Sequence, residues 1–378
     1  MAKLWQRSRE AGKERELVET DLSNILIDKP TVIFLPGIFT THKKKNSVAE
    51  GLDEIETLLK GNGVPLPDIY GMPHNDLANI FNLAAYNGNP DRAFSRSARQ
   101  MAEALILPLV TKDGKPLPEE EAAQNLRNLT LVGYSAGTVF GQELLNASIK
   151  LMKQAGYKEA RARHLLGEVV LISMANVSRP SREKDRFTTL HLASPNDMAV
   201  RLKNRIWRPL ARLFHRHSGD FSIRKLSQRS LLVTARISRD MHEWRRKPDG
   251  TKDKRAIKPL LPPKLKLRSN HEMPHYMTCD DAHNGFSRLV LNSLVNAIRR
   301  NRRLDVTELL EPVNSEEETS YRSRLEEGFR RGDRLTKRRK RGTDDHKKST
   351  ARQDFPAPPA LAPAQPRAGY RGGGAVPV

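Results

Sequence analysis

Residues 128–145, NLTLVGYSAGTVFGQELL, constrain the fold more than any other part of the chain. Residues 129–132 favour a β-strand, whereas the apolar residues that follow Ser135 recur at helical spacing. The period changes at the serine, which predicts a strand, a tight turn and a helix with Ser135 at the apex. Gly133 and Gly137 complete the pattern G-x-S-x-G, and their missing Cβ atoms allow the strand and the helix to approach closely.

A serine at such a turn is suited to nucleophilic catalysis. Its hydroxyl is held clear of the sheet, and the neighbouring N–H of Ala136 lies at a helix N-terminus, where it stabilises a developing negative charge. The string alone is weak evidence, because G-x-S-x-G also arises by chance and can form a purely structural turn. The strand before Ser135 and the helix after it favour the nucleophile.

This turn, Gly133-Tyr134-Ser135-Ala136-Gly137, resembles the nucleophile elbow of the α/β-hydrolase superfamily. The resemblance implies an α/β fold with an eight-stranded, mostly parallel sheet and helices on both faces. It also implies catalytic residues in the chain order serine, acid, histidine.

The resemblance further implies a second oxyanion N–H from the loop after an early strand. Residues 31–35 have the β-branched and aromatic run of a buried strand, and Pro36 and Gly37 end it. By position we assign the N–H to Ile38, with Phe39 as the alternative. The same pattern also fits an ordinary strand-to-helix loop.

The acid is expected just beyond a strand, because ligand chemistry in such sheets collects at the carboxyl ends of the strands. Asp197 follows the strand predicted at 187–193 and is the first candidate. Its alternative role is to cap a helix that begins at Met198. Asp240 is the second candidate, although neighbouring arginines could hold it as a structural ion pair.

The general base is expected between the last predicted strand, residues 264–268, and a helix predicted over residues 281–299. Three histidines are candidates. His283 falls at or inside the helix, which disfavours it. His275 is followed by an aromatic residue and then by an acidic helix start, so it resembles the superfamily's histidine loop better than His271 does. We therefore predict His275 as the base and retain His271 as the alternative.

Positive charge is concentrated in one segment of the chain. Of a formal net charge of +22, residues 201–268 carry 21 Lys and Arg against 5 Asp and Glu. Residues 202–217 would form an amphipathic helix, either a lid or membrane-surface element or a helix docked on the sheet. If Asp197 and His275 share one site, this basic segment borders it and attracts anionic substrates or an anionic membrane surface.

Composition sets the expected domain organisation. The 378 residues can hold one α/β-hydrolase domain at 28–300, after a charged lead-in at 1–27. A basic cap-like insertion includes the lid or surface helix at 201–229. Residues 301–378 read as a low-complexity, disordered tail. The tail's basic run at 337–341 fits a solubilising role better than nucleic-acid binding.

Several classes are disfavoured. The single cysteine, Cys279, excludes an internal disulfide, and no apolar run reaches the length of a membrane span. The charged N-terminus is unlike a signal peptide, which predicts a cytoplasmic protein that can be peripheral to a membrane. No metal-binding motif or P-loop is found, so neither a metal nor an organic cofactor is expected.

These features predict hydrolysis of an ester or related acyl bond in a small-molecule or lipid substrate. Ser135 would attack the carbonyl, His275 would carry the proton, Asp197 would orient the histidine, and the N–H groups of Ile38 and Ala136 would bind the oxyanion. The alternative is a non-catalytic binding protein on the same scaffold. Its basic segment and tail would engage anionic lipid or nucleic acid.

Overall fold

The computed structural model describes residues 3–8, 16–37, 45–72, 95–175, 187–194, 197, 221–235, 242–246, 252–256, 276, 286–313 and 318–351. The chain divides into two compact units, Met1–Arg334 and Leu335–Val378. The sheet and the candidate site belong to the first unit.

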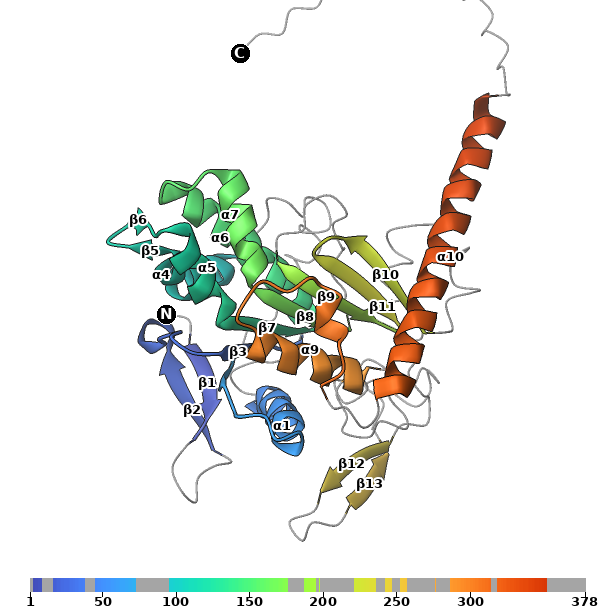
Figure 1. Ribbon diagram of the computed structural model, residues 1–378. Coiled ribbons are helices and arrows are strands. Elements are labelled where there is room, and N and C mark those ends of the chain that lie inside the picture. The colour runs from blue at the N-terminus through green and yellow to red at the C-terminus, as the bar shows by residue number, and fades with distance from the viewer. Residues whose placement is uncertain are drawn as a thin grey trace, which may run out of the picture. The chain divides into compact units, whose positions relative to one another are not determined.

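The fold is α/β, with a mostly parallel central sheet (Figure 1). Nine strands of the described chain form this sheet in the order β10-β11-β9-β8-β7-β3-β4-β1-β2. They are β1 (Lys3–Arg7), β2 (Leu17–Asp21), β3 (Thr31–Leu35), β4 (Asp68–Gly71), β7 (Leu129–Tyr134), β8 (Val170–Met174), β9 (Thr188–Ala193), β10 (Ser222–Ser227) and β11 (Ser230–Thr234).

Six adjacent strands, from β4 to β11 in the sheet order, run parallel. Strands β1 and β10 join this block in antiparallel orientation, and β2 pairs antiparallel with β1. Since the carboxyl ends of parallel strands meet at one edge, the residues that follow β7 and β9 are brought to the same side of the molecule. Those residues include Ser135 and Asp197.

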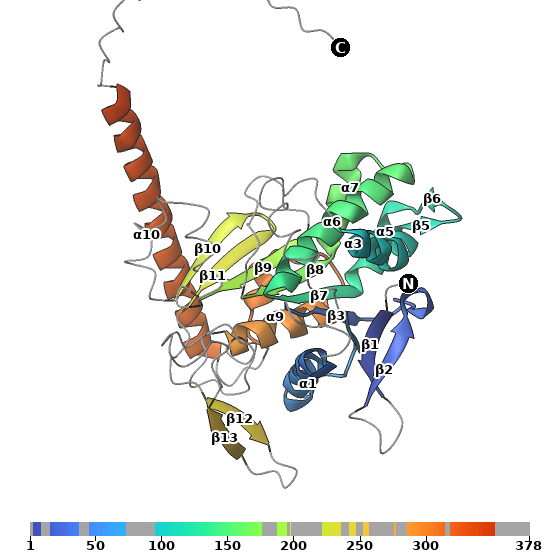
Figure 2. The same cartoon turned by 180° about the vertical axis from the view of Figure 1, so that it is seen from behind.

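Helices cover both faces of the sheet. Described helices are α1 (Lys45–Gly61), α3 (Arg96–Met101), a π-helical turn (Ala102–Ile106), α4 (Leu107–Val110), α5 (Glu119–Arg127), α6 (Ala136–Gln154), α7 (Glu159–Leu165), α9 (Ser287–Arg299) and α10 (Glu318–Ala351). Figure 2 shows α3, α5, α6 and α7 on the face opposite to α1 and α9. Short hairpins are formed by β5 (Thr111–Lys112) with β6 (Lys115–Pro116), and by β12 (His242–Arg246) with β13 (Lys252–Ala256).

Strand β3 shows how alternation along a strand builds two cores. Val32 and Phe34 belong to a hydrophobic cluster with α1 and α9, whereas Ile33 and Leu35 belong to a second cluster with α3 to α7. All four side chains are buried. Full burial of one such side chain contributes about 1.5–3 kcal/mol, so a continuous apolar run is what a strand covered on both faces requires.

The two ends of the chain and the expected lid differ from what the sequence predicted. Residues 3–7 and 17–21 lie in the expected lead-in, and they form strands β1 and β2 of the sheet. Residues 222–227 lie in the expected lid or surface helix, and they form strand β10. Within the expected tail, residues 318–351 form helix α10. Residues 201–220 of the expected lid lie outside the described residues.

Helix α10 packs against β10 through two glycines. A Cβ on Gly332 would lie 1.8 Å from the carbonyl oxygen of Ile223, and a Cβ on Gly328 would lie 2.6 Å from the Phe221 ring. The spacing of four residues places both glycines on one side of the helix. The first turns of α10 therefore cover an edge strand, which otherwise presents unpaired backbone groups.

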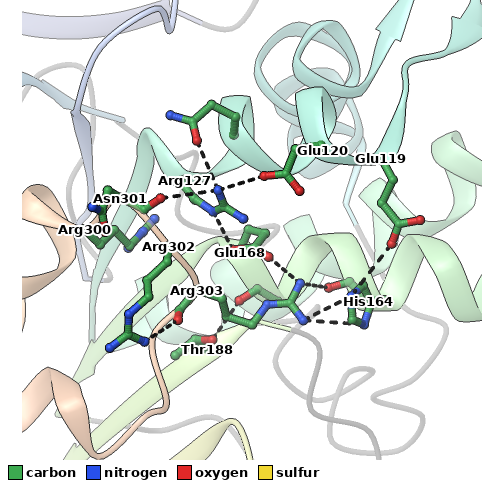
Figure 3. A network of polar contacts seen from close by, with 12 residues as sticks. Glu119, Glu120, Arg127, His164, Glu168, Thr188, Arg300, Asn301, Arg302 and Arg303 are labelled. Atoms are coloured by element: carbon green, nitrogen blue, oxygen red, sulfur yellow. Dashed lines mark hydrogen bonds and ion pairs between the residues drawn. The ribbon is translucent and has the colours of Figure 1, made fainter.

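A polar network centred on Glu168 lies at the amino ends of the parallel strands (Figure 3). This carboxylate, only 4% exposed, lies 3.1 Å from Nε of Arg127 and 2.5 Å from Nη2 of Arg303. Arg300 donates to the carbonyl oxygen of Leu129, at the start of β7. Burial lowers the pKa of Arg300 to about 9, and the charge of Glu168 opposes this shift. Glu168 thus supplies one negative charge to three arginines from distant parts of the chain.

Candidate active site

Ser135 lies at the junction of β7 and α6 in a strained backbone conformation. Its φ is 52° and its ψ is −116°. Residues other than glycine rarely adopt this combination, which costs about 1–3 kcal/mol. Its N–H donates to the carbonyl oxygen of Met174 at 3.0 Å, so β7 stays paired with β8 up to the serine. Helix α6 then starts at Ala136, whose N–H is among those that have no acceptor within the helix.

The side chain of Ser135 does not serve helix α6 as a cap. Ser135 occupies the N-cap position, yet its hydroxyl accepts no hydrogen bond from the first turn of the helix. Its carbonyl oxygen instead accepts from the N–H and the hydroxyl of Thr138. Only 5% of Ser135 is exposed. The strain is therefore not explained by the most common structural use of a serine at a helix N-terminus.

The two glycines of the elbow are required by close backbone contacts. A Cβ on Gly137 would lie 1.9 Å from the carbonyl oxygen of Leu35, at the end of β3. A Cβ on Gly133 would lie 3.0 Å from the carbonyl oxygen of Gly137. The first turn of α6 thus crosses β3 and β7 at a distance that only glycine permits.

The loop after β3 approaches the elbow. A Cβ on Gly37 would lie 3.2 Å from Cβ of Ser135 and 3.2 Å from the Tyr134 ring. Gly37 is followed by Ile38, the expected second oxyanion donor. Ile38 and its alternative Phe39 lie outside the described residues, so this assignment remains a prediction.

Asp197 is fully buried, and its carboxylate is bound by Tyr276. The Tyr276 hydroxyl donates to Oδ2 of Asp197 at 2.7 Å, and it accepts a hydrogen bond from the N–H of Ser194 at 3.3 Å. Burial and then the negative charge of Asp197 raise the pKa of Tyr276 well above its usual value. The phenol is therefore protonated at neutral pH and can act as the donor.

Aromatic contacts connect Tyr276 to the elbow. Its ring meets that of Tyr134 edge to face, with centroids 6.4 Å apart and planes at 65°. The Tyr276 ring also stacks on that of Phe286, with centroids 5.3 Å apart and planes at 13°. Tyr134 directly precedes Ser135, so one side chain joins the segment of the expected nucleophile to the expected acid.

The structure thus brings together Ser135, Ala136 and the Tyr276 that holds Asp197. The expected base His275 and its alternatives His271 and His283 lie outside the described residues, as does the second acid candidate, Asp240. His275 is bonded to Tyr276, and consecutive Cα atoms are about 3.8 Å apart. In the sequence, Tyr276 counted only as the aromatic residue that follows His275, and no role was predicted for it. Its position next to a candidate base was the signal that could have drawn attention to it.

A hollow of about 530 Å³ is lined by Ser95, Arg96, Arg99, Gln100 and Glu103, none of them an expected site residue. The residues that the structure describes contain no group of three or more His, Cys, Asp or Glu placed to hold a metal ion. Among the described helices, none combines the length and apolar content that a membrane span requires.

Comparison with models of protein families gave no match for this chain. Comparison with curated proteins gave no significant match either.

Proposed function

We propose that the protein is a serine hydrolase with an α/β-hydrolase fold, and that it cleaves a carboxylic ester or a related acyl bond. The observation that carries the proposal is the strained Ser135, at φ 52° between β7 and α6, with a side chain that does not cap the helix. Strain of this kind is maintained at functional sites, where the surrounding structure compensates for it. A nucleophile elbow accounts for the strain.

The arrangement around Ser135 supports the roles of two neighbours. The Ala136 N–H, at the start of a 19-residue helix, is a donor for the oxyanion. Asp197 follows the parallel strand β9 and shares Tyr276 with the elbow segment. Tyr276 binds Asp197 and directly follows His275 in the chain, which supports the pairing of this acid with this base.

The reaction follows from these roles. Oγ of Ser135 attacks the carbonyl carbon while His275 takes the hydroxyl proton, and Asp197 orients the imidazole and stabilises its protonated form. The negative oxygen of the tetrahedral intermediate is bound by the N–H groups of Ala136 and Ile38. Collapse expels the alcohol, which receives the proton from the histidine. Water then hydrolyses the acyl-enzyme by the same proton transfers.

A fluorophosphonate probe tests the nucleophile without knowledge of the substrate. We expect the probe to label the wild-type protein and not the Ser135→Ala variant, and the same substitution to abolish hydrolysis of a p-nitrophenyl ester. Ser148→Ala is the matched control. Ser148 is a buried serine on α6 whose hydroxyl donates to Leu144, and its loss should leave labelling intact. Ester hydrolysis by Ser135→Ala within about tenfold of wild type would contradict the proposal.

The remaining triad assignments are tested by two pairs of substitutions. His275→Ala should abolish labelling whereas His271→Ala should have little effect, because triad members act as a unit. The opposite result would assign the base to His271. In the same way, inactivation by Asp240→Asn but not by Asp197→Asn would transfer the role of the acid to Asp240.

The basic segment at 201–268 leads us to propose an anionic substrate or an anionic membrane surface as its partner. Turnover of long-chain esters should be faster in anionic vesicles than in neutral ones and should fall with added salt, which screens the attraction. Reversing Arg205, Arg208 and Arg212 to Glu together should weaken vesicle binding. Hydrolysis of a small neutral ester should not change. Unaltered binding to anionic vesicles would reject the membrane partner.

A further inference from the structure

The hydroxyl and the ring of Tyr276 both contact described residues. Its hydroxyl donates to Asp197 and accepts from the Ser194 N–H, so it bridges the turn that follows β9. Its ring lies between Phe286, just before α9, and Tyr134, at the end of β7. The side chain is fully buried. These contacts leave the phenol one orientation, in which the hydroxyl points at the carboxylate.

A donor on Asp197 affects the histidine that the carboxylate would orient in the proposed triad. A hydrogen bond from a neutral hydroxyl disperses part of the negative charge of a carboxylate. The carboxylate then stabilises an imidazolium less than it would without that donor. Loss of the hydroxyl should therefore raise the pKa of the histidine, in addition to releasing the carboxylate from its fixed orientation.

We propose that Tyr276 is a positioning residue of the hydrolase site: its hydroxyl fixes the orientation of Asp197 and tunes the acidity of the histidine base. This inference rests on the proposed function. Among the described residues, the titratable groups that face Tyr276 are Asp197 and Tyr134. The other two neighbours, the Ser194 N–H and the Phe286 ring, do not titrate.

Tyr276→Phe removes the hydroxyl and keeps both ring contacts. The measurement is the second-order rate constant for labelling by a fluorophosphonate, followed from pH 5 to pH 9. We expect this constant to fall about tenfold, as for loss of a hydrogen bond to a charged group. The acidic limb of the pH profile should move to higher pH by roughly half a unit, because the histidine becomes more basic.

Tyr157→Phe is the matched control. The Tyr157 hydroxyl is also buried and donates to the carbonyl oxygen of Val110 at 2.6 Å, but it lies in the hydrophobic cluster formed with α3 to α7. Its loss should affect stability without moving the pH profile. An unmoved profile in Tyr276→Phe, or an equal movement in Tyr157→Phe, would overturn the proposal.

Urea unfolding of each variant keeps the proposal falsifiable if Tyr276→Phe is poorly folded, because labelling is then compared at an equal folded fraction. In the Asp197→Asn background, where residual labelling is followed at high probe concentration, Tyr276→Phe should cause little additional loss, because its effect acts through the carboxylate. Fully additive losses would overturn the proposal. Absence of labelling in the wild-type protein would overturn the proposed function together with this inference. Wild-type labelling with an unmoved profile in the variant would overturn the inference alone.

Discussion

Replacing Glu168 by Gln removes one negative charge from a cluster of arginines and leaves the side-chain shape almost unchanged. The carboxylate is 4% exposed and lies 3.1 Å from Arg127 Nε and 2.5 Å from Arg303 Nη2. At an effective dielectric constant of about 20, each contact corresponds to roughly 5–7 kcal/mol of Coulomb attraction before desolvation is subtracted. Removal of one partner from a buried ion pair typically costs about 3–5 kcal/mol in net stability.

The structure places the expected loss at the lower end of that range. The side chains of Arg127 and Arg303 are 13% and 26% exposed, so each can recover part of its hydration when the carboxylate is lost. Arg300 acts in the opposite direction, because its buried guanidinium loses the charge that supports its protonated form. We therefore expect Glu168→Gln to lower the free energy of unfolding by about 3 kcal/mol.

Glu120→Gln is a control with the same chemistry and a shared partner. Glu120 lies 3.4 Å from Nη1 of Arg127, but its side chain is 86% exposed. An exposed ion pair contributes at most about 1 kcal/mol. Urea unfolding followed by circular dichroism should separate the two variants clearly. Equal losses, or a loss below about 1 kcal/mol for Glu168→Gln, would refute the view that burial makes this carboxylate important.

Three further predictions concern the elbow and a buried acid. Gly137→Ala should destabilise the protein by about 3 kcal/mol in urea unfolding, because the new Cβ meets the Leu35 carbonyl, whereas Gly61→Ala, with open space around it, should be neutral. Ser135→Gly should be more stable than Ser135→Ala by about 1 kcal/mol, since glycine adopts a positive φ without strain; equal stabilities would contradict the strain. Burial raises the pKa of Glu143 above its usual 4.5, so the folded state binds the extra proton and this group's contribution to stability falls as the pH rises from 4.5 through the raised pKa. The thermal midpoint of Glu143→Gln should therefore fall less than that of the wild type as the pH rises over that range. Parallel curves of thermal midpoint against pH would contradict a raised pKa of Glu143.

The sequence by itself determined the turn at Ser135 and several strands of the parallel block. Residues 31–35 and 129–132 were recognisable because a strand covered on both faces has a run of β-branched and apolar side chains, and both lie within observed strands. The helix after Ser135 was recognisable from its period, and the glycines from the geometry of the turn. Local patterns were sufficient here because each residue's preference agrees with its final environment.

Elements with mixed composition could not be identified from local patterns. Strand β2 is short and largely exposed, so it lacks the apolar alternation that marks a strand, and its place is set by pairing with β1. Helix α10 is strongly polar, and its charge led us to expect a disordered tail. Among the described residues of α10, the hydrophobic side chains that contact the core cluster recur every four residues. They are Tyr321, Leu325 and Phe329. This spacing could have predicted a helix. The need for glycine at position 328 could not be predicted, because it depends on contact with Phe221 and Ile223.

The candidate site divides in the same way. The serine was readable from sequence because an elbow is built from consecutive residues, each of which the turn geometry constrains. The contact of Tyr276 with Asp197 was not, because it joins segments about 80 residues apart that meet only when the sheet is assembled. A hydrogen bond between distant side chains leaves no periodic trace in the sequence. Tertiary packing alone decided that the tyrosine next to the predicted base would bind the predicted acid.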